Sequence, residues 1–153
     1  LCALIPVCSS REEAVDAALD LIDKNSLAYE AVEVGKKFVN QSASNLHDHY
    51  GDMSPVHSLN NLAVVIWAFL SFQDSFDEAI GETICCGWDT DCTGATVGGL
   101  IGLDKGSIPE SWTDPWQGRV NTAIAGVGEL KLEDLVERTC KLVDQFSSES
   151  DMD

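Results

Sequence analysis

The longest uninterrupted apolar run, Leu62 to Leu70, constrains the fold most strongly. Its nine residues are too few to cross a bilayer, which takes about 20 apolar residues in a helix. A helix that is apolar on most of its sides lies in the centre of a fold, because it has no polar face to turn toward water. We therefore expect a globular fold built around a helix that starts near Ser58.

The rest of the sequence is also typical of helices. Capping boxes of the S-x-x-E kind occur at Ser9 and Ser10 and again at Ser75, each followed by apolar residues at helical spacing. We expect further helices over residues 27–40, from 94 onward and over 132–146, irregular chain over 41–57 and 105–118, and no strands. The sequence thus predicts an all-α fold, with one helical domain over 1–146 and an acidic, disordered tail over 147–153.

The charge excludes some partners. The chain of 153 residues has 9 Lys and Arg against 26 Asp and Glu, a formal charge of −17. Nucleic acids and anionic membrane surfaces are both bound through basic faces, so neither is expected as a partner. An anionic substrate stays possible where a divalent cation bridges it to the protein.

The opening, Leu1 to Cys8, fits neither a signal peptide nor a spanning helix, and we expect the chain to begin partway through a larger sequence.

Cysteine and histidine allow two other interpretations. The six cysteines contain no C-x-x-C pair, which favours reduced, structural thiols and hence a cytoplasmic protein. A zinc site at His47, His49 and His57 is one alternative, although H-x-H in a polar segment is commonly solvated. A thiol nucleophile among Cys85, Cys86 and Cys92 is the other, and no histidine lies near them in sequence.

The segment Gly87-Trp88-Asp89-Thr90-Asp91-Cys92-Thr93-Gly94 carries the sharpest chemical signal. Two carboxylates separated by one residue in an extended turn project to the same side, and hard divalent cations prefer oxygen ligands. Asp91 could instead cap the following helix, with Asp89 as a turn residue. Spacing alone leaves both interpretations open.

The order of several motifs resembles that of the ADP-ribosylglycohydrolase family. The segments that carry the resemblance are Asn60–Ala68, Ser75–Ile80, Gly87–Cys92, Gly94–Gly98 and Ile108–Trp112. Residues 9–40 are similar to a further family segment, so the resemblance covers most of the chain. It implies an all-α orthogonal helical bundle that holds a pair of Mg²⁺ or Mn²⁺ ions. It also implies hydrolysis of the glycosidic bond between ADP-ribose and an acceptor.

The resemblance gives roles to three residues. It implies that Asp89 and Asp91 are metal ligands, and Trp88 becomes a candidate contact for the ADP-ribosylated substrate; no catalytic residue is assigned. Many family members have Thr where this chain has Cys92, so the third ligand stays open. The family's T-D-D motif, which supplies its other ligands, does not occur. We therefore expect the chain to correspond to the C-terminal portion of the domain and to be inactive alone.

Two broader expectations complete the sequence-based view. The alternative to a hydrolase is a non-catalytic helical interaction module derived from the same family. We also expect a homodimer or other homo-oligomer, because apolar residues over Leu1–Val7 and a stripe of Gly94, Gly98 and Gly102 would otherwise be exposed. Three glycines on one helix face further predict that another backbone approaches closely.

Overall fold

A computed structural model describes the backbone of residues 1–150 and the side chains of residues 1–147. Its contacts form two compact units, Leu1–Ile108 and Pro109–Asp153. Helices dominate, so the predicted all-α class is confirmed. The expectation that residues 1–146 form a single domain stays a prediction.

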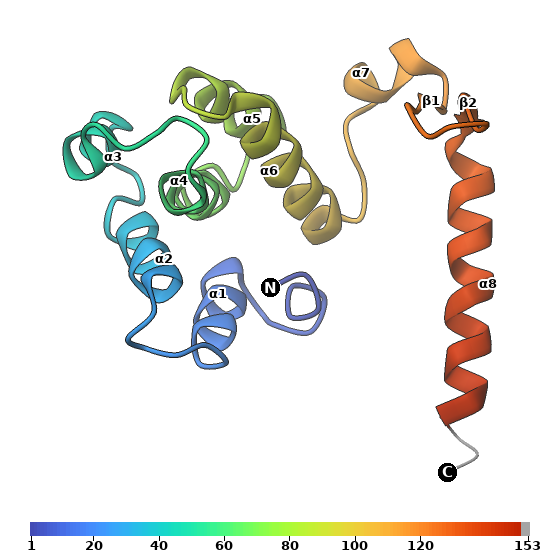
Figure 1. The fold of residues 1–153 in the computed structure, drawn as a ribbon, viewed down its shortest axis with the longest axis horizontal. Coiled ribbons are helices and arrows are strands. Elements are labelled where there is room, and N and C mark those ends of the chain that lie inside the picture. Colours follow the sequence, from blue (N-terminus) through green and yellow to red (C-terminus); the bar gives the residue numbers. More distant parts are fainter. Residues whose placement is uncertain (151–153) are drawn as a thin grey trace. The chain divides into compact units, whose positions relative to one another are not determined.

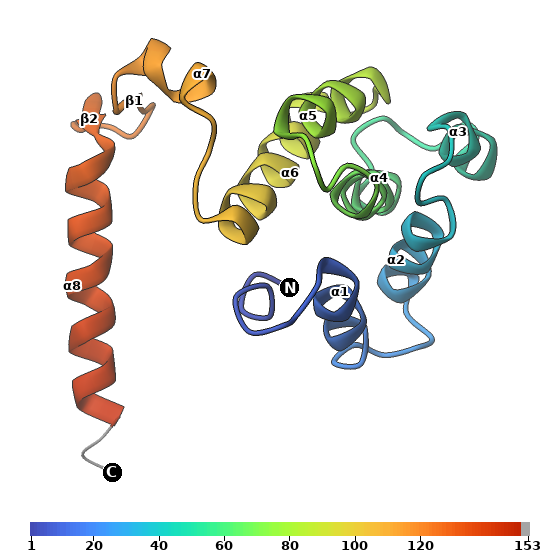
Figure 2. The ribbon, with the colours of Figure 1, turned by 180° about the vertical axis from the view of Figure 1, so that it is seen from behind.

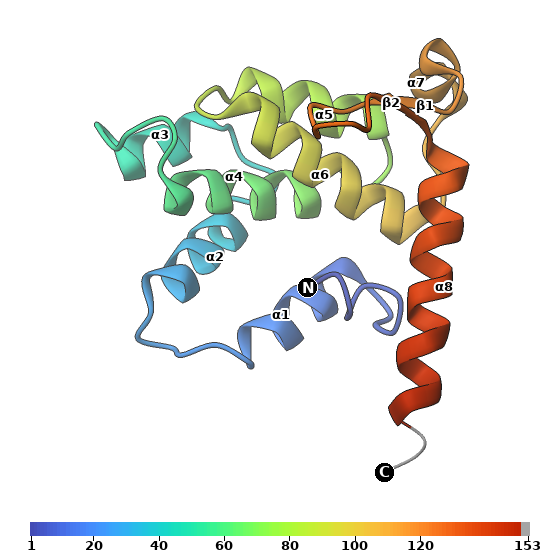
Figure 3. The same ribbon diagram turned by 45° about the vertical axis from the view of Figure 1, so that its right-hand side comes forward.

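The first unit contains six helices, one of which is central and is surrounded by the other five. They are α1 (Arg11–Leu19), α2 (Leu27–Lys37), α3 (Ser44–Tyr50), α4 (Ser58–Ser71), α5 (Phe76–Cys85) and α6 (Thr90–Lys105). The predicted apolar run lies in α4, where every residue from Ala63 to Leu70 is buried. Helix α4 contacts α2, α5 and α6, with α5 and α6 on one side of it and α2 on another (Figures 1 and 3).

The predicted capping residues begin the helices as expected. The side chains of Ser10 and Ser75 accept hydrogen bonds from the backbone N–H groups of Glu13 and Glu78, at 3.1 and 3.2 Å. The carboxylate of Glu13 in turn accepts from the N–H of Ser9 at 2.7 Å, one residue before the N-cap Ser10, so the bond back from Glu13 reaches one residue further than in a standard capping box. These local contacts define where α1 and α5 start.

Residues 41–57 are not wholly irregular, since they contain α3. The sequence shows no helical periodicity there because α3 is short and buries only Leu46. Its remaining side chains are polar or half-buried, so the pattern resembles that of a loop.

The glycine stripe of α6 faces side chains and no other backbone, which corrects the predicted close approach. A Cβ at Gly94 would lie 2.9 Å from Ile84 Cδ1, and one at Gly98 would lie 3.4 Å from Ile80 Cδ1. At Gly102 the nearest atom is Ile108 Cγ1 at 3.2 Å. The stripe therefore makes room for isoleucine side chains of α5 and of the segment after α6.

The close backbone approach occurs instead at Gly35 in α2. A Cβ there would lie 2.7 Å from the carbonyl oxygen of Ala63 and 2.8 Å from Ile66 Cβ, both in α4. Because neither atom belongs to a flexible side-chain end, only glycine lets α2 pack this closely on α4. Gly81 in α5 is a useful contrast, since it is exposed and a Cβ there would meet nothing within 4 Å.

We expect Gly35→Ala to lower the free energy of unfolding by about 1–3 kcal/mol, because the methyl group forces α2 and α4 apart. The matched control Gly81→Ala should raise it by up to about 1 kcal/mol, since alanine loses less backbone freedom in a helix. Urea unfolding followed by circular dichroism measures both. Equal stability of the two variants would contradict the assignment of the close crossing to Gly35.

The second unit consists of a short hairpin followed by one long helix. It contains α7 (Glu110–Thr113), a 3₁₀ turn η1 (Asp114–Trp116), β1 (Arg119–Asn121), β2 (Glu129–Lys131) and α8 (Leu132–Ser150). The antiparallel strands pair Val120 with Leu130, and they lie at the N-terminal end of α8 (Figure 2). No strands were expected, because segments of three residues are too short to show alternation.

Helix α8 runs past the expected end at residue 146, through Ser150. Acidic side chains in its first turn, at Glu133 and Asp134, favour this start through the helix dipole. The predicted disordered tail therefore overlaps α8 over 147–150, and its last residues, 151–153, lie outside the described part of the chain.

The two surfaces behind the expected homo-oligomer are largely covered within the first unit. Ile5 is buried, and Leu1, Leu4 and Cys8 pack against the core, although Val7 is exposed. The glycine stripe is covered as described above. The homo-oligomer stays a prediction, but these surfaces no longer supply its reason.

Candidate metal centre

The turn between α5 and α6 has an unusual backbone. Gly87 and Trp88 are consecutive residues with positive φ, +80° and +60°. Glycine adopts this conformation freely, whereas a bulky residue held there costs on the order of 1–3 kcal/mol and needs support from its surroundings. The turn leads directly into Asp89 and the first residue of α6, Thr90.

Asp89, Asp91 and Cys92 come together at the start of α6. One ligand atom from each residue lies within 4.8 Å of the other two. Among the described residues, this is the cluster of three His, Cys, Asp or Glu side chains that could hold a metal ion. Asp89 is the N-cap residue of α6, yet its side chain makes no capping hydrogen bond. Its carboxylate is therefore not committed to the backbone amides of the helix, which argues against a purely capping role.

The donor set fits a hard divalent cation in part. Two carboxylates supply negative charge and oxygen ligands, as Mg²⁺ and Mn²⁺ require. The pKa of the Cys92 thiol is raised, chiefly by its hydrogen bond to Asp89 and also by the negative charges of Asp89 and Asp91. Because a protonated thiol is a poor ligand for Mg²⁺, Asp89 and Asp91 are the residues of this group that suit the ion.

The backbone of Asp89 is held from two sides. Its N–H donates to Oδ1 of Asn61 in α4 at 3.2 Å. Its carbonyl oxygen accepts from the N–H and the hydroxyl of Thr93, at 2.9 and 3.0 Å. Asn61 in turn donates to the carbonyl oxygens of Pro55 and His57, both at 2.8 Å. The start of α4 is thus tied to the start of α6.

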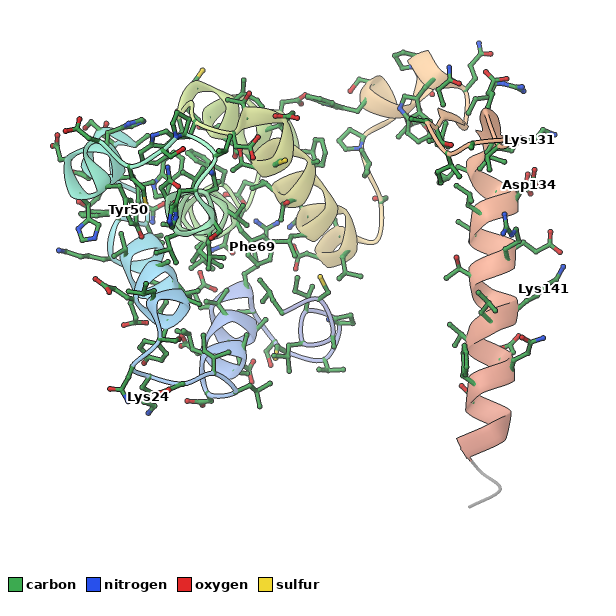
Figure 4. The ribbon with its side chains drawn as sticks, viewed as in Figure 1. Lys24, Tyr50, Phe69, Lys131, Asp134 and Lys141 are labelled. Carbon is green, nitrogen blue, oxygen red and sulfur yellow. The ribbon has the colours of Figure 1, made fainter. Side chains whose placement is uncertain are left out.

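Trp88 is half-buried and lies against α3. Its ring centroid is 4.1 Å from that of His47 and 6.1 Å from that of Tyr50, with the tyrosine ring edge-on at 81°. Burial, with a smaller contribution from Glu30, raises the pKa of Tyr50 to about 12. Figure 4 labels Tyr50 at the end of α3. The sequence suggested a role for His47 only as a zinc ligand, and it did not show the contacts of His47 and Tyr50 with Trp88, because both residues lie about forty positions upstream, in a segment without helical periodicity.

The structure gives little support to the two alternative sites, a zinc site at the histidines and a thiol nucleophile. The described residues show no histidine cluster with zinc geometry, and Nδ1 of His57 accepts from the N–H of Leu59 at 3.2 Å. His47 Nε2 does lie 4.0 Å from Cys86 Sγ. However, burial and the nearby Glu82 raise the pKa of Cys86 to about 11, so this thiol stays protonated near neutral pH. That disfavours Cys86 as a nucleophile.

All six cysteines are free thiols in the structure. Only Cys86 is buried, whereas Cys8 is half-buried and the other four thiols are exposed, so of the expected structural thiols only Cys86 lies in the core. The described residues contain no helix long and apolar enough to span a bilayer.

Comparison with known proteins identifies the family. The sequence model of the ADP-ribosylglycohydrolase family matches residues 2–150. No curated protein and no solved structure gives a significant match. The family match spans nearly the whole sequence, including the turn that carries Asp89 and Asp91. The chain belongs to the ADP-ribosylglycohydrolase family.

Proposed function

We propose that this chain supplies Asp89 and Asp91 as one side of a Mg²⁺ or Mn²⁺ site in a hydrolase. Its reaction is cleavage of the glycosidic bond between ADP-ribose and an acceptor. The observation that carries the proposal is the convergence of two carboxylates at a helix start, with the Asp89 side chain not used for capping. Membership of the ADP-ribosylglycohydrolase family supports the proposal that these two carboxylates bind a metal ion for glycosidic bond hydrolysis.

The residues of this chain would bind and orient rather than transfer protons. Bound at Asp89 and Asp91, the ion supplies positive charge and a template for orienting substrate and water. Asn61 and Thr93 fix the Asp89 backbone, so that the turn from which its carboxylate projects is held in place before a ligand arrives. The two aspartates are ligands in this proposal, and no general base is assigned to the chain.

The proposed substrate is an ADP-ribosylated acceptor, which carries a diphosphate. A chain of formal charge −17 repels such a substrate unless a cation lies between them, so the metal also explains how the two associate. Trp88, next to Asp89, stays a proposed substrate contact. Because His47 stacks on one face of its ring, any substrate contact would use the rest of that ring.

Two carboxylates make an incomplete site for Mg²⁺, which favours six oxygens in near-octahedral geometry. The sequence contains no T-D-D motif. We therefore expect that the purified 153-residue chain, given ADP-ribosylated arginine and either Mg²⁺ or Mn²⁺, releases no ADP-ribose above the rate without protein. Chromatographic detection of free ADP-ribose tests this, and turnover that depends on added metal would show that the chain holds a complete site.

A non-catalytic helical module of the same family is the second candidate. Cys92, at a position where many family members have Thr, favours it, because a sulfur side chain supplies no oxygen ligand for Mg²⁺. Metal binding separates the two candidates. Specific Mn²⁺ binding at Asp89 and Asp91 supports the hydrolase site, whereas its absence supports the module.

A further inference from the structure

The α5–α6 turn needs an external support that the metal site itself does not provide. Trp88 occupies the left-handed region at φ +60°, immediately before Asp89. If Trp88 relaxed to an ordinary conformation, the direction of the chain into Asp89 would change with it. What holds Trp88 therefore also holds the carboxylate that follows.

His47 makes two contacts with this turn, one polar and one through its ring. Its Nε2 lies 2.6 Å from the carbonyl oxygen of Cys86, and its ring is tilted by 34° over the Trp88 ring at 4.1 Å between centroids. A carbonyl oxygen only accepts hydrogen bonds, so Nε2 carries the proton in this contact. The two contacts lie on either side of Gly87, one at Cys86 and one at Trp88. They therefore hold the turn at both neighbours of its conformationally freest residue.

Helix α3 presents a second aromatic residue to the same ring. Tyr50 follows His47 by three positions, a spacing that places both on one face of a helix. Its ring meets Trp88 edge-on at 6.1 Å. Leu46, which is fully buried, anchors α3 in the core. The support for Trp88 thus comes from a helix that is itself fixed to the core.

We propose that His47 is a positioning residue for the metal site, which holds Trp88 in its left-handed conformation and thereby directs the Asp89 carboxylate toward the ion. This inference rests on the proposed function, because it assigns His47 a role in the same site. His47 does not touch the ion; it acts through the Cys86 carbonyl and the Trp88 ring.

Four variants separate the two contacts. His47→Ala removes both, His47→Phe keeps a ring without a donor, and His47→Gln keeps a donor without an aromatic ring. His49→Ala is the matched control, because it removes a histidine of the same helix whose ring contacts are with Phe38 and Tyr50. Circular dichroism shows which variants are folded, and the Phe and Gln variants carry the test if the Ala variant is not.

The first measurement is Mn²⁺ affinity, from the electron paramagnetic resonance signal of free Mn²⁺. Residues that orient a metal ligand change metal affinity by about 10–100-fold when they are replaced. We expect His47→Ala to weaken binding about tenfold, the lower end of that range. His47→Phe and His47→Gln should each bind more tightly than His47→Ala, and His49→Ala should bind as the wild type does.

The second measurement is Trp88 fluorescence in a Trp112→Phe/Trp116→Phe background. The other remaining tryptophan, Trp67, is 1% exposed and gives a constant contribution. We expect a red shift in His47→Ala and in His47→Gln, because the ring that covers Trp88 is gone, and little shift in His47→Phe. If His47 only stabilised α3, the fluorescence shift would not depend on whether the replacing residue keeps an aromatic ring, as in His47→Phe, or only a hydrogen-bond donor, as in His47→Gln.

The outcomes distinguish this inference from the proposed function. Absence of Mn²⁺ binding in the wild type overturns both. Mn²⁺ binding that Asp89→Asn/Asp91→Asn abolishes, but that His47→Ala leaves at wild-type strength, overturns the role of His47 and leaves the metal site intact. An equal loss in His47→Ala and His49→Ala also overturns it, because α3 as a whole would then be responsible.

Discussion

The double variant Asp89→Asn/Asp91→Asn is expected to lose the specific Mn²⁺ binding of the chain. Removing two charges that face one ion removes most of the attraction, and the amide oxygens that replace them are weaker ligands. We expect affinity to fall by at least about 100-fold, at or beyond the upper end of what replacement of an orienting residue causes. Each single variant should fall between the double variant and the wild type.

The control must account for the many other acidic residues. Glu133→Gln/Asp134→Asn removes the same charge from the first turn of α8, also at a helix start. If the wild type binds Mn²⁺ only through diffuse charge, this variant will lose as much affinity as the Asp89/Asp91 variant. We expect it to retain wild-type affinity, since no group of three ligand atoms was found there.

Thermal unfolding gives an independent readout of the same site. A ligand that binds only the folded state raises stability by about 2.7 kcal/mol at 100 times its dissociation constant. Mn²⁺ should therefore raise the Tm of the wild type and of the α8 control, but not that of Asp89→Asn/Asp91→Asn. Without metal, the double variant should differ little in stability from the wild type, because relief of the repulsion between the two carboxylates is offset by loss of the favourable interaction of Asp91 with the dipole of α6.

Replacing Arg11 by alanine is expected to cause the largest loss of stability. The Arg11 side chain is 3% exposed, and its Nε and Nη2 lie 3.0 and 2.9 Å from Oδ2 of Asp104 in α6. Its Nη1 donates to the carbonyl oxygens of Phe69 and Phe72 at the end of α4, at 2.8 and 3.3 Å. One guanidinium thus joins α1, α4 and α6.

The Phe69 ring adds a further contact to this buried cation. The guanidinium carbon lies 4.7 Å from the ring centroid, and Figure 4 labels Phe69 in the interior of the first unit. Alanine would remove the cation, leave the Asp104 carboxylate without this partner and strip the α4 carbonyl oxygens of their donors. Breaking a buried pair in this way costs about 3–5 kcal/mol.

An exposed ion pair offers the matched comparison. Lys36 in α2 lies 2.6 Å from Asp16 in α1, so it also links two helices, but its side chain is 31% and that of Asp16 59% exposed. Solvent screens this pair, and Lys36→Ala should cost less than about 1 kcal/mol. Urea unfolding compares the two variants. A loss for Arg11→Ala no larger than that for Lys36→Ala would show that the buried guanidinium does not hold the helices together.

Asp104→Asn tests the same pair from its other partner. It leaves the Arg11 charge buried without a counterion but keeps a hydrogen-bond acceptor. We therefore expect a smaller loss than for Arg11→Ala. Arg11→Lys should also lose stability, because an ammonium group cannot reach Asp104 and the α4 carbonyl oxygens with the same planar fork.

Local sequence patterns predicted much of this fold because their causes are local. Ser10 and Ser75 cap helices through residues three positions away, and the apolar run in α4 can only be buried. The order of motifs around Asp89 and Asp91 was sufficient to indicate the family, and the family match agrees. The prediction that the chain has no strands was wrong, because segments of three residues are too short to show an alternating pattern.

Contacts between distant segments could not be read from the chain. The glycine pattern pointed to α6, yet the tight backbone crossing lies at Gly35, because crowding depends on which helix faces which. His47 lies 39 positions from Cys86, and only packing of α3 against the α5–α6 turn makes it a neighbour of Trp88. Spacing along the chain placed two carboxylates together, since they share a turn. The His47 ring that contacts Trp88 in this turn comes from α3, which reaches the turn only when the core forms.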